Sequence, residues 1–272
     1  MSPSTTALIT TALITGASAG IGAVYADRLA HRGHDLILVA RDKARLDATA
    51  ERLRAQTGRA VATLAADLSA RPDLLRVEQR LREDPSITML VNNAGIAVSG
   101  PMLGSDVDRL EAMVDLNITA ALRLAHAAVA GFVARGQGTL VNVASVLALM
   151  PERFNATYSG SKAFLLNMSL ALRTELADTG IRVQAVLPGA TRTELWGKAG
   201  IDVASLPADR LMDVEEMVDA ALAGLDMGEA VTIPSLPDME DWARFDGARL
   251  ALGPNLSRSR AAERYRQAGT GA

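Results

Sequence analysis

The stretch Thr15-Gly16-Ala17-Ser18-Ala19-Gly20-Ile21-Gly22 decides the fold. A short apolar run leads into it, and a helical pattern follows from about residue 23. Glycines at such a turn let the backbone approach a phosphate, and the first turn of a helix supplies unpaired N–H groups and the positive end of a dipole. The spacing is GxxxGxG rather than the commoner GxGxxG. The stretch predicts a strand, a turn and a helix that bind a nucleotide, with a plain tight turn as the alternative.

Seven apolar runs alternate with helical patterns along the chain. They cover residues 12–15, 36–40, 60–64, 87–91, 139–143, 183–187 and 230–233. Most are continuously apolar, which is typical of strands that helices cover on both faces. Amphipathic stretches such as 44–56 separate them. The alternation predicts an α/β protein with a doubly wound Rossmann-type fold: a seven-stranded parallel sheet in the order 3-2-1-4-5-6-7, with helices on both faces.

The two ends of the chain depart from this alternation. TALIT occurs twice, at residues 6–10 and 11–15, and only the second copy leads directly into the glycine turn. We therefore predict the second copy as the first strand and about residues 1–10 as a tail. From about Pro234 the sequence predicts one helix and then an arginine-rich, mobile tail over about 254–272. No linker divides the chain, so we expect a single domain over 1–272.

Composition excludes several classes of protein. Of the 272 residues 49% are hydrophobic and the net charge is −3, which argues against disorder and against nucleic-acid binding. There is no cysteine, so disulfides, thiolate nucleophiles and iron–sulfur clusters are excluded. The three histidines form no metal-binding pattern, so we expect no metal. No run reaches the roughly 18 unbroken apolar residues of a membrane span, and the N-terminus lacks a cationic signal region, so we expect a cytoplasmic protein.

The pattern TGxxxGxG of residues 15–22 resembles the short-chain dehydrogenase/reductase family, and the family's other motifs follow in order. Residues 92–95 read NNAG after the fourth predicted strand, and Asn117 lies in the next helical stretch. Ser145 ends the fifth strand, thirteen residues before the YxxxK motif of Tyr158 and Lys162. Residues 188–193 read PGxxxT after the sixth strand. The resemblance covers about residues 11–233, and it is closest to one-domain, NADP-preferring members.

The resemblance implies a set of cofactor-binding residues that follow the first, second, third, fourth and sixth predicted strands or lie in the YxxxK stretch. Asp67 matches the family acid that contacts adenine. The full set is Gly16, Ser18, Gly20, Ile21, Gly22, Arg41, Asp67, Leu68, Asn93, Ala94, Gly95, Tyr158, Lys162, Pro188, Gly189, Thr191 and Thr193.

The end of the second predicted strand indicates which cofactor is used. NAD-preferring sites usually carry an acid there, which binds the ribose 2′-hydroxyl. Here the strand ends at Ala40 and Arg41 follows, whose guanidinium suits a 2′-phosphate. Many NADP-using relatives have a base at the position of Ala19, so the prediction rests mainly on Arg41. We predict NADP, with NAD as the second choice. The alternative is that Arg41 is a solvated loop residue, for which Asp42 is a candidate partner.

Four residues are predicted to carry the catalysis: Asn117, Ser145, Tyr158 and Lys162. Tyr158 and Lys162 lie four apart in a helical stretch and project from one face. An ammonium about 4 Å from the phenol would lower its pKa by up to about three units at an effective dielectric of about 20, and desolvation of the phenol would offset part of that shift. The resemblance makes Tyr158 the acid and base, places Ser145 on the substrate oxygen and Lys162 on the nicotinamide ribose, and gives Asn117 a proton-relay water. A capping serine, a buried tyrosine and a surface lysine are the alternatives.

These residues predict an NADP-dependent oxidoreductase that interconverts a carbonyl and a secondary alcohol. The alternatives are a 3-oxoacyl thioester reductase and a non-catalytic NADP-binding sensor. Leu147, Met150, Phe154 and Trp196 predict an apolar wall around a small substrate, although packing under a lid would explain them as well, and an inward Arg153 would suit a carboxylate. Small apolar residues in 105–133 and 155–178 predict, through the resemblance, a homodimer or homotetramer, with burial against the chain's own sheet as the alternative.

Overall fold

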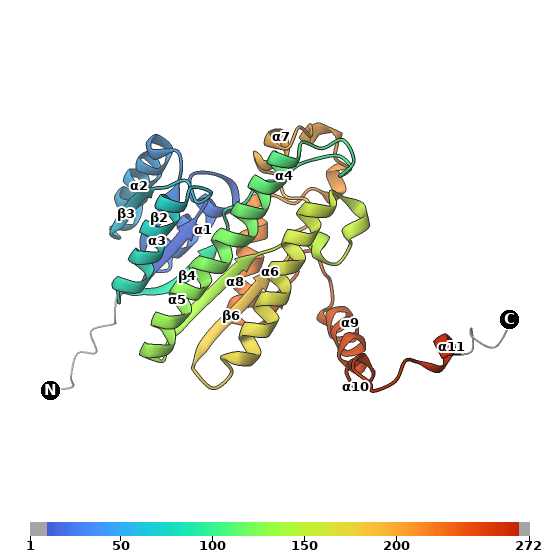
Figure 1. The fold of residues 1–272 in the computed structure, drawn as a ribbon. Helices are drawn as coiled ribbons and strands as arrows, with labels where there is room; N and C mark the ends of the chain where they lie inside the picture. The colour runs from blue at the N-terminus through green and yellow to red at the C-terminus, as the bar shows by residue number, and fades with distance from the viewer. Residues whose placement is uncertain (1–9, 267–272) are drawn as a thin grey trace. The chain divides into compact units, whose positions relative to one another are not determined.

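A computed structural model describes residues 10–266 (Figure 1). The chain divides into two compact units, Met1–Pro234 and Ser235–Ala272. The first unit contains the whole sheet and every predicted site residue. The prediction of one domain over the whole chain stays a prediction.

The first unit is built on a seven-stranded sheet whose paired strands all run parallel, in the order β3-β2-β1-β4-β5-β6-β7. The predicted fold class and strand order are confirmed. The second TALIT copy is the central strand β1, and residues 6–9 of the first copy lie outside the described residues. The strands are β1 Thr11–Thr15, β2 Asp35–Ala40, β3 Val61–Ala65, β4 Ile87–Asn92, β5 Gly138–Val143, β6 Ile181–Val186 and β7 Val231–Thr232.

Helices cover both faces of the sheet, as Figure 1 shows. On one face pack α1 (Gly20–His31), α2 (Lys43–Thr57) and α8 (Val214–Asp226). On the other face pack α3 (Arg71–Glu83), α5 (Ala121–Arg135) and α6 (Ala156–Glu175). Strand β1 supplies both cores, because alternate side chains of a strand point to opposite faces. Ala12 and Ile14 belong to the first core and Leu13 to the second, and all three are fully buried.

The longest helical segment is interrupted by a π-helical stretch. Helix α4 (Val107–Val114) continues through Asp115–Ala120, a π-helix, into α5. Among the described residues, Val107–Arg135 is the one helix apolar and long enough to cross a membrane by length and composition, with a mean hydropathy of 1.4. It carries Leu124, Ala128 and Phe132, which are buried in the second core, so it is the covering helix of a sheet.

The remaining elements of the first unit are short. The 3-10 turns are Val146–Ala148, Pro151–Arg153, Val203–Ser205 and Ala208–Arg210, and α7 spans Leu195–Lys198. They lie in the segments that follow the carboxyl ends of β5 and β6, the edge of the sheet where ligands bind in open α/β folds.

In its described part, residues 235–266, the second unit has three helices and no buried residue. Helix α9 (Met239–Ala251) is the helix expected after Pro234. The sequence predicted only a tail beyond about residue 254, whereas the structure has two further four-residue helices, α10 (Gly253–Leu256) and α11 (Glu263–Arg266). Pro254 stands in the first turn of α10, where its missing N–H is tolerated. The predicted mobility of this segment stays a prediction.

Candidate active site

The predicted site residues follow the carboxyl ends of the parallel strands, which meet at one edge of the sheet. Tyr158 and Lys162 on α6 and Asn117 in the π-helix Asp115–Ala120 are the predicted site residues that lie elsewhere. The glycine turn follows β1, Arg41 follows β2, Asp67 and Leu68 follow β3, Asn93–Gly95 follow β4, Ser145 follows β5, and Pro188, Gly189, Thr191 and Thr193 follow β6. The parallel sheet therefore brings motifs that are far apart in the sequence to the same edge.

The glycine turn has the backbone that only glycine adopts readily. Gly16 and Gly20 have φ values of +67° and +52°. A Cβ on Gly22 would lie 2.4 Å from the carbonyl oxygen of Gly16, so the turn cannot accept a side chain there. Helix α1 begins at Gly20, three residues earlier than the sequence indicated. The turn is therefore tighter than predicted and the helix starts inside the motif.

The Thr15 hydroxyl joins this turn to the loop after β4. The backbone N–H groups of Asn93 and Ala94 both donate to its Oγ1 at 2.9 Å, and the hydroxyl donates to the carbonyl of Val91 at 3.3 Å. The Asn93 side chain donates in return to the Thr15 carbonyl at 2.8 Å. The two glycine-bearing loops are thereby fixed as one rigid surface.

The start of α1 fits an anionic cofactor group. Its N-cap is Ala19, which offers no side-chain acceptor, and the first turn carries no acidic residue. The first N–H groups of the helix therefore have no side-chain partner from the cap, and the positive end of the dipole is not neutralised there. A pyrophosphate would satisfy both features. The residues of the turn thus fit the dinucleotide that the sequence predicted.

Arg41 is exposed at the end of β2, and among residues 10–266 its side chain makes no hydrogen bond or ion pair. Asp42 does not pair with it, because the Asp42 carboxylate caps α2 by accepting from the N–H of Arg45 at 3.0 Å. The alternative of an Arg41–Asp42 pair is therefore wrong. The Asp67 carboxylate accepts from the N–H of Ser69 at 3.0 Å, so this acid shapes its own loop.

Tyr158 and Lys162 are both buried in the first turns of α6. The Lys162 ammonium donates to the carbonyl of Val143, the last residue of β5, at 3.0 Å. It lies 5.6 Å from the centre of the Tyr158 ring. The Ser145 hydroxyl accepts from the N–H of Leu147 at 3.1 Å and so caps the following 3-10 turn. Ser145 therefore has the capping role that was the alternative to a catalytic one. A tyrosine, a lysine and a serine thus converge at the end of β5.

Asn117 lies in the π-helix and is 1% exposed. Its amide exchanges two hydrogen bonds with the backbone of Ile96, at 2.9 and 3.0 Å, and donates to the Ser161 hydroxyl at 3.1 Å. A Cβ on Gly95 would lie 3.1 Å from the Asn117 Oδ1 and 3.6 Å from the Lys162 Nζ. The loop after β4 therefore rests directly on Asn117 and Lys162. π-Helical insertions are frequent at functional sites.

Burial sets the acidities of the Tyr158 and Lys162 side chains. Burial raises the pKa of Tyr158 to about 12, and a hydrogen bond with the Ser145 hydroxyl opposes that shift. Burial lowers the pKa of Lys162 to about 8. The prediction that Lys162 lowers the tyrosine pKa is wrong for the chain by itself, because loss of solvation outweighs the attraction of an ammonium directed at Val143. The tyrosine is a neutral proton donor at neutral pH.

Apolar and aromatic side chains surround Tyr158. The Phe154 ring packs edge-on against Tyr158, with centroids 5.3 Å apart, and against Trp196, with centroids 6.4 Å apart. Leu147 packs against the same cluster. Met150 is 39% exposed and is not part of that cluster, and Arg153 is exposed. The predicted wall therefore consists of Leu147, Phe154 and Trp196.

The segment after β6 crosses in front of the glycine turn. A Cβ on Gly20 would contact the Thr193 side chain at 3.3 Å. The Trp196 indole N–H donates to the Thr191 carbonyl at 2.8 Å. This segment thus has the position of a lid.

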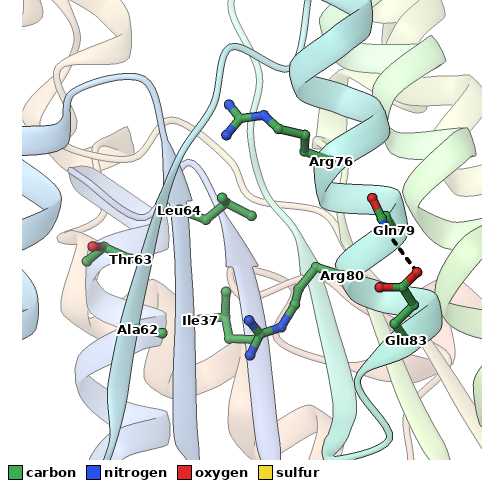
Figure 2. A pocket seen from close by; sticks show the side chains of 8 residues that line it. All are labelled: Ile37, Ala62, Thr63, Leu64, Arg76, Gln79, Arg80 and Glu83. Atoms are coloured by element: carbon green, nitrogen blue, oxygen red, sulfur yellow. Dashed lines mark hydrogen bonds between the residues drawn. The ribbon is translucent and has the colours of Figure 1, made fainter.

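A shallow cavity of about 230 Å³ lies elsewhere, between the edge strand β3 and helix α3 (Figure 2). Its polar lining consists mainly of Arg76, Gln79, Arg80 and Glu83 from α3, and Gln79 donates to Glu83 at 2.9 Å. It contains none of the predicted catalytic or cofactor residues. We assign it no function.

The family model for short chain dehydrogenases matches residues 10–203. That is well over half of the chain. The chain belongs to the short-chain dehydrogenase/reductase family. It is an NAD(P)-dependent oxidoreductase of that family, which explains the glycine turn, the buried tyrosine and lysine and their common edge of the sheet.

Two solved structures of the family are similar over almost the whole chain. A short-chain dehydrogenase from Sphingobium yanoikuyae in complex with NADPH is 52% identical, with a TM-score of 0.91 over 94% of this chain and 99% of that one. A bulky-bulky ketone specific alcohol dehydrogenase from Comamonas testosteroni is 47% identical, with a TM-score of 0.88 over 95% of this chain and 99% of that one. A very-long-chain 3-oxoacyl-CoA reductase from Anas platyrhynchos is 34% identical over 68% of this chain and 60% of that protein.

Three contributions to the site were missed at the level of sequence. They are the bridging hydroxyl of Thr15, the Ser161 hydroxyl on Asn117, and a contact between Arg45 on α2 and Glu194 in the lid. Thr15 and Ser161 lie inside the quoted motifs, so their position was a usable signal. Arg45 and Glu194 are 149 residues apart, and no local pattern joins them.

We predict that Lys162 titrates near pH 8 in the cofactor-free protein. Between about pH 8 and its ordinary pKa of 10.5, the unfolded chain binds a proton that the folded chain does not, so this group raises the free energy of unfolding as the pH rises. The chain has only three lysines, so NMR of side-chain-labelled lysine resolves the titration, and a Lys162→Met variant assigns the resonance. Titration of the Lys162 resonance near 10.5 would contradict the burial argument.

Proposed function

We propose that this protein is an NADP-dependent reductase and dehydrogenase that interconverts a carbonyl and a secondary alcohol on a small, apolar substrate. The observation that carries the proposal is the buried Tyr158 phenol beside Ser145, four residues before the buried Lys162. A neutral phenol is a proton donor for a carbonyl oxygen, and a hydroxyl next to it suits the same oxygen. The aromatic wall favours an apolar substituent on that carbonyl.

The cofactor supplies or accepts the hydride when it is bound. The chain's own residues handle the proton. Tyr158 donates its proton during reduction and, as a phenolate, accepts one during oxidation. Below about pH 8 the Lys162 side chain is a cation 5.6 Å from the Tyr158 ring, so its charge favours the phenolate when that forms. Ser145 holds the substrate oxygen next to the phenol.

Support for NADP comes from two observations. Arg41 is an exposed guanidinium without a partner among the described residues, at the strand end where the ribose of a dinucleotide lies in Rossmann folds. The similar Sphingobium structure was obtained in complex with NADPH. Guanidinium groups bind phosphates through paired hydrogen bonds. NAD stays the second choice.

Two other functions were weighed. A 3-oxoacyl thioester reductase is favoured by the likeness to the very-long-chain 3-oxoacyl-CoA reductase, but the chain spans only 60% of that protein. The ketone-specific relative is covered over 99% of its length and is more similar, at 47% identity. A non-catalytic NADP sensor would not need four intact residues at Asn117, Ser145, Tyr158 and Lys162. We therefore prefer ketone and alcohol chemistry.

Assembly into a homodimer or homotetramer is part of the proposal. The continuous helix of α4 and α5 carries exposed Val107, Leu122 and Val133, which are 70%, 45% and 41% exposed. Its small residues Ala125 and Ala128 are already buried against the sheet, so they do not support an interface. Light scattering at micromolar concentration is expected to give at least a dimer, and a monomer would contradict this part of the proposal.

Replacement of Tyr158 by Phe is expected to lower turnover by about 10²–10⁴-fold, because it deletes the proton donor and keeps the ring. Cofactor binding, followed by NADPH fluorescence, should survive. Tyr25→Phe is the matched control, because the Tyr25 hydroxyl is buried in α1 without a hydrogen-bond partner in the described part of the chain. Retained activity in Tyr158→Phe would move the chemistry to another group.

Replacement of Arg41 by Ala is expected to weaken NADPH binding by about 1.5–3 kcal/mol, the contribution of a hydrogen bond to a charged group, with little effect on NADH. Both affinities are measurable by fluorescence titration. Arg173→Ala is the control, because this exposed arginine lines a cavity with Ile181 at the opposite end of the strands. Equal losses for the two cofactors, or a parent enzyme that prefers NADH, would contradict the assignment.

Activity with NADPH is expected to rise along a series of ketones of growing chain length. Each methylene buried against Leu147, Phe154 and Trp196 adds about 0.8 kcal/mol to binding. The measurement is kcat/KM for methyl ketones from three to eight carbons, together with an aryl ketone, a sugar and a phosphorylated ketone. A flat series with activity only on the sugar or the phosphate would contradict the apolar pocket.

A further inference from the structure

The lid segment, residues 191–199, is attached to the rest of the fold by backbone contacts at both ends. At its start, Thr191 forms a bridge with Met212, and the Arg192 N–H donates to the Met212 carbonyl at 2.9 Å. At its end, the Ala199 carbonyl accepts from the Ser99 hydroxyl at 2.5 Å. Between these anchors the segment passes the glycine turn, where a Cβ on Gly20 would lie 3.3 Å from the Thr193 side chain. Trp196 packs against Phe154, and Leu195 packs against the cluster that contains Tyr158. A polar contact holds the middle of the segment in addition.

An ion pair joins Glu194, in the middle of the lid, to Arg45 on helix α2. The two guanidinium nitrogens of Arg45, in the first turn of α2, donate to the two carboxylate oxygens of Glu194 at 2.7 and 3.1 Å. This is the two-bond geometry in which a guanidinium and a carboxylate fit best. Arg45 and Lys198 hold the pKa of Glu194 down to about 2, so the pair stays charged at all physiological pH values. Glu194 directly follows Thr193, the residue against the glycine turn.

We propose that Arg45 and Glu194 are a positioning pair that straps the lid across the cofactor site and slows cofactor release. This inference rests on the proposed function, because it takes the cofactor to lie on the glycine turn. Arg45 acts through Glu194 and does not itself bind the cofactor, because its guanidinium already donates to Glu194. The guanidinium of Arg41 has no partner among the described residues and is the group that binds the 2′-phosphate in the proposed function.

The strength of the pair suits a strap that opens in every cycle. The two side chains are 45% and 48% exposed, so water and salt screen the attraction. Exposed pairs contribute at most about 1 kcal/mol, which corresponds to about a fivefold change in an equilibrium. A buried pair in this place would keep the product cofactor bound. An exposed two-bond pair can close the lid and still release it.

The lid contains its own reporter. Trp196 lies two residues after Glu194 and is one of only two tryptophans, so a Trp242→Phe background isolates its emission. In cofactor-free protein we expect Arg45→Gln and Glu194→Gln to shift the Trp196 emission in the same way, and the double variant to shift it no further. Raised salt should shift the parent toward the variants. Lys198→Gln is the control, because Lys198 pairs with Glu194 within the lid and does not reach α2.

Release of the cofactor is measured by stopped-flow fluorescence. We expect Arg45→Gln and Glu194→Gln each to speed the release of NADPH and of NADH by about three- to fivefold, without additivity in the double variant and with kcat at saturating cofactor not reduced. Loss of NADPH affinity alone in Arg45→Gln, with Glu194→Gln unchanged, would overturn the proposal and make Arg45 a phosphate ligand. Identical Trp196 emission in all cofactor-free variants would overturn it as well.

Failure of the proposed function and failure of the Arg45–Glu194 strap give different experimental results. A parent enzyme that binds neither NADPH nor NADH would refute the proposed function and the effect on release, whatever the emission of Trp196. A parent that binds NADPH normally but whose release is insensitive to both substitutions would refute the strap and leave the proposed function standing. Arg45→Lys, which keeps the charge and loses the two-bond geometry, should fall between parent and Arg45→Gln in release rate.

Discussion

The site depends on the hydrogen bonds that the Thr15 hydroxyl makes with the loop after β4. It accepts from the N–H groups of Asn93 and Ala94 and so locks the end of β1 to the end of β4, the two central strands of the sheet. The glycine turn stands on one side of that lock. The loop on the other side reaches Gly95, which rests on Asn117 and Lys162. The glycine turn and helix α6, which carries Tyr158 and Lys162, are therefore held in one rigid frame by a side chain that is not in the predicted catalytic or cofactor-binding sets.

Burial of charge-bearing groups is the second constraint, and it works against stability. Lys162 is 5% exposed and its pKa is lowered to about 8, so the folded chain holds an ammonium at neutral pH with less solvation than in the unfolded chain. The hydrogen bond to Val143 offsets part of that penalty. Active sites commonly accept such a loss, because shifted pKa values are what acid and base catalysis uses. The same burial keeps the Tyr158 phenol protonated.

The sequence predicted the sheet order, the choice of the second TALIT as β1 and the place of every motif, because hydrophobic periodicity and glycine spacing are local signals. It failed where an outcome depends on distant neighbours. The attraction of the Lys162 ammonium was expected to outweigh the desolvation of the Tyr158 phenol, whereas burial by the whole fold dominates its pKa. Asp42 was offered as a partner for Arg41, but it caps α2. The contact between Arg45 and Glu194 joins residues that only the fold brings together.

The π-helical segment Asp115–Ala120 has a consequence for how this enzyme can vary. An α-helix advances about 100° per residue, so the wider turn changes the rotational phase between α4 and α5. Asn117 reaches the Ser161 hydroxyl on α6 in that phase, and α5 buries Leu124 and Phe132 in the same phase. Removal of a single residue here would rotate one of the two faces away from its partner. The length of this helix is therefore constrained more tightly than the identity of its exposed side chains.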